Sequence, residues 1–151
     1  PDQPEVNNQH AVILQKLGKL QEAEIAYLKT IKLKNEYVEA YYNLANLLIN
    51  TGRHKEAIKH LERTVSIRPG FVEALNNIGF AYLELGKLVE AGSYFKKAIN
   101  IDPSYYEAYE NLSSLQFKQG KFEDGLKSVF KGCGAVEFSD DQSDHFTIII
   151  G

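Results

Sequence analysis

Apolar positions along the chain recur with the period of an α-helix, and glycine or proline interrupts each periodic segment. In the first clear segment, Ala40, Leu44, Leu47 and Leu48 lie on one face of a helix. Gly52 follows, and glycine readily adopts the left-handed conformation of a tight helix exit. The pattern therefore predicts an amphipathic helix that ends at Gly52.

A second apolar stripe follows this glycine and is formed by Ala57, Ile58, Leu61 and Val65. Pro69 comes next, and proline stops a helix because it lacks the backbone N–H donor. Residues 37–70 therefore predict two helices joined by a short turn. Strand patterns do not occur before the last residues of the chain.

The same pattern recurs at a spacing of 34 residues. Three columns in register carry the repeat: Gly18, Gly52, Gly86 and Gly120; Ala23, Ala57, Ala91 and Gly125; His10, Leu44, Ile78 and Leu112. They divide residues 1–138 into units 3–36, 37–70, 71–104 and 105–138, and leave a linker and tail at 139–151. We predict an all-α array of eight helices in four antiparallel pairs, with no sheet inside residues 3–132. The small-residue columns predict close helix crossings.

The third unit resembles the tetratricopeptide repeat through Leu75, Ile78, Gly79, Tyr82, Gly86, Ala91, Phe95, Ala98 and Pro103. The second unit matches the same pattern. The resemblance implies a right-handed α-solenoid whose first helices line a concave side. Unit 1 departs from it at Asn7 and His10, and unit 4 departs at Gly125 and Gly132. We therefore expect looser end units, with the last helix ending near Gly132.

An extended concave surface is the natural place to bind a partner segment. The residues that we predict to bind a protein or peptide there are Tyr42, Asn43, Asn46, Asn77, Phe80, Asn111 and Phe117. Gln9, Asn43, Asn77 and Asn111 form a column, and amide groups can pair with an extended peptide backbone. This column is similar to the asparagine ladder in the repeat arm of O-linked N-acetylglucosamine transferases. The alternative is that these amides bond a neighbouring helix, and that Phe80 and Phe117 pack between helices.

Some members of the family capture a C-terminal carboxylate with a clamp of basic and amide residues. The basic positions of that clamp hold Asn8, Tyr42, Asn76 and Glu110, so we do not expect such a clamp. The glutamates Glu5, Glu39, Glu73 and Glu107 fall in the first turn of each first helix. A favourable interaction with the helix dipole explains that column better than binding of basic ligands does.

Composition and motifs exclude several other classes. The formal net charge of -3 argues against a nucleic-acid binder, and no apolar run is long enough to span a membrane. We find no catalytic constellation, cofactor motif or metal site. His54 and His60 are expected to be solvated, and Cys133 is expected to be a small, buried thiol. We therefore expect a non-enzymatic interaction module, cytoplasmic by its lack of disulfides.

The chain has no methionine, position 1 included, and we interpret it as an arm of a larger protein. Two further hypotheses stay open: a self-assembling scaffold, and the substrate-recruiting arm of a transferase. The last unit and the tail predict self-association, as a homodimer through the C-terminal unit. The residues expected to drive it are Leu126, Val129, Phe130, Phe146, Ile148, Ile149 and Ile150, which all need burial. Two alternatives stay open: the tail docks on unit 4 of its own chain, or it is the start of a removed domain.

Overall fold

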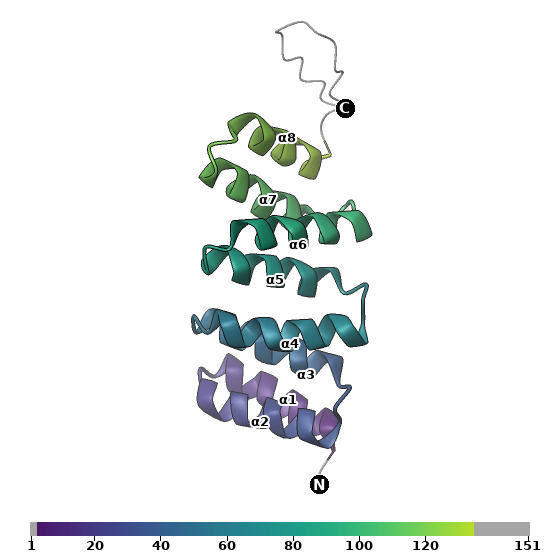
Figure 1. Ribbon diagram of the computed structural model, residues 1–151. Coiled ribbons are helices and arrows are strands. Elements are labelled where there is room, and N and C mark those ends of the chain that lie inside the picture. Colours follow the sequence, from purple (N-terminus) through teal and green to yellow (C-terminus); the bar gives the residue numbers. More distant parts are fainter. Residues whose placement is uncertain (1–2, 135–151) are drawn as a thin grey trace, which may run out of the picture.

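The computed structural model describes residues 3–134, which fold entirely into α-helices and turns (Figure 1). The helices are α1 (Pro4–Lys16), α2 (Leu20–Leu33), α3 (Val38–Asn50), α4 (His54–Ile67), α5 (Val72–Glu84), α6 (Leu88–Ile101), α7 (Tyr106–Lys118) and α8 (Phe122–Gly132). The described residues contain no strand. The predicted four helix pairs are confirmed, and the last helix ends at Gly132 as expected.

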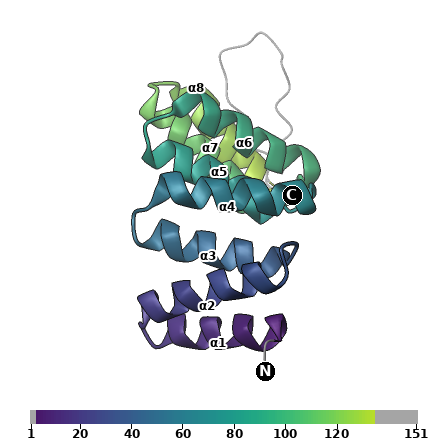
Figure 2. The ribbon, with the colours of Figure 1, turned by 60° about the horizontal axis from the view of Figure 1, so that its bottom comes forward.

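The pairs stack one on another into a right-handed α-solenoid, from α1 and α2 at one end to α7 and α8 at the other (Figures 1 and 2). Each helix contacts its pair partner and the first helix of the next unit. The first helices also contact one another, α1 with α3, α3 with α5, and α5 with α7, whereas the second helices do not. The first helices are therefore the inner helices, and α2, α4, α6 and α8 are the outer helices.

Glycine closes the turn inside every unit. Gly18, Gly52, Gly86 and Gly120 all have φ between 72° and 76°, which disfavours any residue with a Cβ atom. At Gly52, the backbone N–H donates to Ile49 O at 2.9 Å, and Arg53 N–H donates to Leu48 O at 2.8 Å. These bonds satisfy carbonyls at the end of α3 and turn the chain back into α4.

The core lies between the two helix layers, where the small-residue columns are buried. Ala23, Ala57 and Ala91 have no exposed surface, and neither do Ala11 and Ala45. Large apolar side chains fill the space around them, with Leu44, Leu61 and Phe95 almost completely buried. Close packing of this kind is sensitive to added volume, so the columns set the distance between the helix axes.

In unit 4, where we expected looser packing, glycines on α8 lie directly against aromatic residues on α7. A Cβ atom added to Gly125 would lie 2.6 Å from Phe117 Cε1. A Cβ atom added to Gly132 would lie 2.8 Å from Tyr109 Cβ. The missing side chains on α8 therefore make room for rings on α7. The glycines compensate for bulk on the facing helix.

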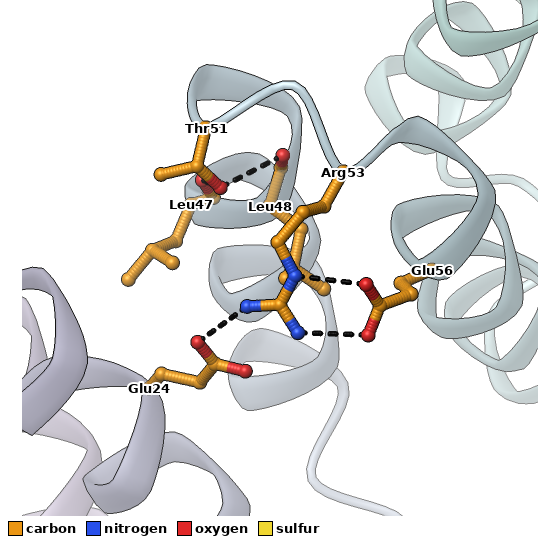
Figure 3. A network of polar contacts seen from close by, with 6 residues as sticks. All are labelled: Glu24, Leu47, Leu48, Thr51, Arg53 and Glu56. Carbon is orange, nitrogen blue, oxygen red and sulfur yellow. Dashed lines mark hydrogen bonds and ion pairs between the residues drawn. The ribbon is translucent and has the colours of Figure 1, made fainter.

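A network around Arg53 joins unit 1 to unit 2 at the start of α4 (Figure 3). Arg53 Nη1 donates to Glu24 Oε2 of α2 at 2.6 Å. Its Nε and Nη2 donate to the two carboxylate oxygens of Glu56, at 2.8 and 2.7 Å. The guanidinium thus forms a bidentate bond within its own unit and a second bond to the preceding unit.

The first inner helix carries polar groups that its neighbours do not satisfy. Asn8 is 8% exposed, and its Oδ1 has no hydrogen-bond partner within residues 3–134. The buried Nδ2 of Asn7 also has no partner in this range. A buried amide without a hydrogen bond is destabilising, so these two groups weaken the packing of α1.

Candidate functional site

The inner face is a surface of four parallel helix stripes, one from each inner helix. On α3 the stripe contains Tyr42 and Asn46, and both side chains point toward the next inner helix, α5. Asn77 Nδ2 donates to Asn46 Oδ1 at 2.8 Å and lies 3.5 Å from the Tyr42 hydroxyl. These three predicted site residues therefore form one group that connects units 2 and 3.

The same connection recurs one unit further along. Asn111 Nδ2 donates to Asn76 Oδ1 at 3.0 Å, and it joins α7 to α5. The structural use of the asparagine column is thus observed at Asn77 and Asn111. These bonds engage only the amide nitrogens. Among the described residues, the Oδ1 atoms of Asn77 and Asn111 accept no hydrogen bond, and the Asn43 side-chain amide forms none.

The predicted aromatic residues pack against their own neighbours more than the concave prediction assumed. Phe80 is half-buried against a core cluster that includes Leu83 and Phe95, and the His54 ring meets its edge at 6.4 Å between centroids. Phe117 is 36% exposed and lies over Gly125. The packing alternative therefore accounts for much of both rings, and Phe117 is the more exposed of the two.

A repeated triad of glutamate, cation and aromatic ring lies where the first turn of an inner helix meets the end of its unit. In unit 1, Lys34 Nζ is 3.3 Å from Glu5 Oε1 and 5.2 Å from the centre of the Tyr37 ring. We call this arrangement a rim triad. The pKa of Glu5 is lowered by a backbone hydrogen bond first and by Lys34 second. Ion pairing therefore adds to the helix-end effect that the sequence suggested for this column.

Unit 2 repeats the rim triad with an arginine. Arg68 Nη2 is 3.0 Å from Glu39 Oε1, and its guanidinium carbon is 5.1 Å from the Phe71 ring centre. Both charged side chains are about half exposed, so the ion pair itself contributes little to stability. The ion pair instead fixes the position of the Arg68 guanidinium group. The Phe71 ring also packs against the Tyr42 ring, with 4.7 Å between the ring centres and an angle of 33° between the planes, and this contact connects the rim to the inner face.

Unit 3 has the glutamate and the ring but replaces the cation with Asp102. Asp102 Oδ1 accepts hydrogen bonds from the Ser104 backbone N–H at 2.9 Å and from Ser104 Oγ at 2.6 Å, which lower the pKa of the carboxyl group. Burial raises the pKa of Tyr105 to about 12, and the charges of Glu107 and Glu73 add to this shift. Within the described residues, Glu73 has no ion pair.

Sequence reasoning missed this third triad. The prediction rested on the glutamate column and left out two further columns, which are Lys34, Arg68 and Asp102, and Tyr37, Phe71 and Tyr105. Both columns follow the 34-residue spacing. The sequence therefore contained the signal, because the charge at this repeat position changes from positive in units 1 and 2 to negative in unit 3.

The prediction that His54 and His60 are solvated was wrong, and so was the prediction that Cys133 is buried, because Cys133 is exposed. His54 is half-buried, and its buried Nδ1 has no partner in the described part of the chain. His60 is also half-buried, 6.0 Å from the Tyr41 ring, and burial lowers its pKa. Over residues 3–134, no group of three or more His, Cys, Asp or Glu residues is arranged to hold a metal ion. None of the described helices is long and apolar enough to span a bilayer.

The end of the solenoid exposes apolar surface on α8. Leu126 is 48% exposed, whereas Ile58, its equivalent in unit 2, is 7% exposed. Val129 and Phe130 are half-buried on the same helix. The remaining residues predicted to drive self-association, Phe146, Ile148, Ile149 and Ile150, lie outside the described residues.

Sequence profiles decide the family. A profile described as Tetratricopeptide repeat matches residues 72–105, and a second profile of the same description matches residues 2–70. The chain belongs to the tetratricopeptide repeat family. Repeats of this family serve protein–protein interaction, so the chain is a protein-interaction module. No curated protein matches the sequence.

Solved structures of tetratricopeptide repeat proteins share the fold. MamA 41-end from Desulfovibrio magneticus RS-1 is 23% identical with a TM-score of 0.82, over 88% of this chain and 75% of that one. Pseudomonas aeruginosa pilF is 18% identical with a TM-score of 0.81, over 89% and 61%. The first repeat domain of Spaghetti (RPAP3), bound to the HSP90 peptide SRMEEVD, is 20% identical with a TM-score of 0.74, over 78% and 93%.

Proposed function

We propose that the inner face of this chain binds an extended segment of a partner protein. The observation that carries the proposal is the row of half-buried amides at Asn43, Asn77 and Asn111, in register along three inner helices. Family membership supports binding of protein. The solved relative that holds a peptide supports binding of an extended segment by this fold.

The hydrogen bonds between inner helices make this row suitable for binding. Because the Asn46 and Asn76 carbonyl oxygens hold the nitrogens of Asn77 and Asn111, the two amide groups have fixed orientations. Their Oδ1 atoms can then accept backbone N–H groups of an extended segment. Asn43 can both donate and accept. Recognition of this kind depends on the peptide backbone and tolerates different side chains.

We further propose that this row acts in the same way as the asparagine ladder in the repeat arm of O-linked N-acetylglucosamine transferases. As an extension of the proposal, this module recruits the substrate of an enzyme that carries it. Tyr42 and Asn46 take part by positioning Asn77. Phe80 and Phe117 give the face its apolar part, with Phe117 offering the larger exposed edge.

Fluorescence anisotropy with a labelled, unstructured peptide of repeating Ser-Leu-Gln tests the proposal. Each lost hydrogen bond costs about 0.5–1.5 kcal/mol, so the triple variant Asn43→Ala, Asn77→Ala, Asn111→Ala should bind roughly tenfold more weakly or worse. The control variant changes the outer residues His60 and Lys97 to Ala. Binding that survives the triple change and disappears in the control would place the partner on the outer wall.

Self-association through the last unit is the second candidate function. It is favoured by Leu126, which has the repeat position of a buried isoleucine but is half exposed. A second copy of the chain would cover this surface and so remove apolar area from water. The tail residues 146–150 are proposed to contribute to the same contact.

A further inference from the structure

The rim triad of unit 3 contains an anion and an aromatic ring without the cation that accompanies them in units 1 and 2. Lys34 and Arg68 each contact a glutamate and a ring at the same repeat position. At Glu73 and Tyr105 the corresponding residue is Asp102, which has the opposite charge. The two occupied triads show which chemistry this arrangement accepts, namely an ammonium or guanidinium group.

We infer that Glu73 and Tyr105 bind a lysine or arginine side chain of the partner segment, so that the partner supplies the cation missing from unit 3. This inference rests on the proposed function, because the segment must lie along the inner face to reach the rim. The cation would lie against the Glu73 carboxylate and over the Tyr105 ring, as Arg68 lies against Glu39 and Phe71.

The charge of the two walls favours the same class of partner. The inner helices contain six glutamates (Glu5, Glu39, Glu73, Glu84, Glu107 and Glu110) and two lysines (Lys16 and Lys118). The outer helices contain seven acidic and nine basic residues. Because Lys34 and Arg68 pair with Glu5 and Glu39, the excess negative charge of the inner helices lies in units 3 and 4, where it attracts a basic segment.

This partner differs in charge from the peptide held by one solved relative. That peptide, SRMEEVD, carries three acidic residues and one arginine. In this chain, the positions at which a clamp would place cations hold Asn8, Tyr42, Asn76 and Glu110. An acidic segment would meet Glu73, Glu107 and Glu110 with no compensating lysine or arginine at those positions. Repulsion at these glutamates selects against it.

The test compares three labelled peptides that differ only in charge, repeating Ser-Leu-Lys, Ser-Leu-Gln and Ser-Leu-Glu, on the full chain at low salt. We expect the lysine peptide to bind about three- to tenfold more tightly than the glutamine peptide, and the glutamate peptide to bind most weakly. Asp102→Lys restores an internal triad as in unit 1 and should remove the preference for lysine. Glu73→Gln should reduce it while leaving the Asp102–Ser104 turn in place.

Matched outer variants control for overall charge. Glu90→Lys and Glu90→Gln, on the outer helix α6, change the net charge by the same amounts and should leave the preference unchanged. Circular dichroism of each variant checks the fold. Equal binding of the lysine and glutamine peptides overturns this inference but leaves the proposed function standing. A preference that is lost equally in the Glu90 variants also overturns it, and the absence of binding by all three peptides contradicts both proposals.

Discussion

The ring of Phe95 lies directly against the backbone of Gly79, where a Cβ atom would come within 2.6 Å of Phe95 Cε1 and 2.7 Å of Cδ1. Both residues are buried at the crossing of α5 and α6. In unit 2 the same two positions hold Ala45 and Leu61. A smaller residue on the inner helix thus accompanies a larger one on the outer helix, and the two together conserve the volume of the crossing.

Replacing Gly79 with alanine should destabilise the chain by about 1–3 kcal/mol, because the new methyl group overlaps a buried ring. Combining Gly79→Ala with Phe95→Leu reproduces the pair found in unit 2 and should recover part of that loss. Urea denaturation followed by circular dichroism measures both effects. Gly70→Ala is the control, since nothing lies within 4 Å of a Cβ atom there. A neutral Gly79→Ala variant would show that the ring moves aside at no cost.

Stability should fall as the pH drops from about 7 to about 5.5, and His60 should cause part of the fall. Burial lowers the pKa of His60 below its ordinary value of 6.5, so the unfolded chain binds a proton more readily than the folded chain. The contribution of His60 to stability is complete above the unfolded pKa of 6.5, and it is lost as the pH falls through the lowered pKa of the folded chain. Melting temperatures at the two pH values test this. The difference between them should shrink in His60→Gln, and an unchanged difference would assign it to other groups.

Removing the Arg53 side chain should weaken the junction between units 1 and 2, and the effect should depend on salt. Arg53→Ala removes the ion pairs with Glu24 and Glu56. Because the guanidinium is partly exposed, added salt screens these pairs in the parent chain. We expect a lower melting temperature than the parent at low salt and a smaller difference in molar salt. Arg53→Lys should give an intermediate value, since an ammonium cannot form the bidentate bond.

If the last unit drives self-association, Leu126→Asp should convert a concentration-dependent oligomer into a monomer. The equivalent residue in unit 2, Ile58, is buried, and this indicates how fully the position is removed from water once another surface covers it. Analytical ultracentrifugation over a range of concentrations measures the change. The control, Val89→Asp, alters another exposed apolar residue on the outer helix α6. A parent chain that is monomeric throughout would remove this candidate function, and truncation after Ser139 separates the part played by the tail.

The fold followed from the sequence because its determinants are local and repeated. Gly52 and Pro69 mark helix ends by their own backbone preferences, and the 34-residue spacing multiplies each signal. The inner face was harder, because its contacts join different units. The bond between Asn77 and Asn46 and the ion pair between Arg68 and Glu39 depend on how units stack. The packing of Phe80 depends on stacking for the same reason, since the His54 ring of the preceding outer helix lies 6.4 Å from it.

The three contacts between successive inner helices differ in their amide hydrogen bonds. Amide hydrogen bonds brace the seam between α3 and α5 and the seam between α5 and α7. At the seam between α1 and α3, the corresponding oxygen, on Asn8, has no partner within the described residues, and Asn43 forms no bond. We therefore expect a change in superhelical pitch to cost least between units 1 and 2, where the described residues form no amide hydrogen bond between the inner helices. On the outer side of this junction, the bond between Arg53 and Glu24 still holds the two units together.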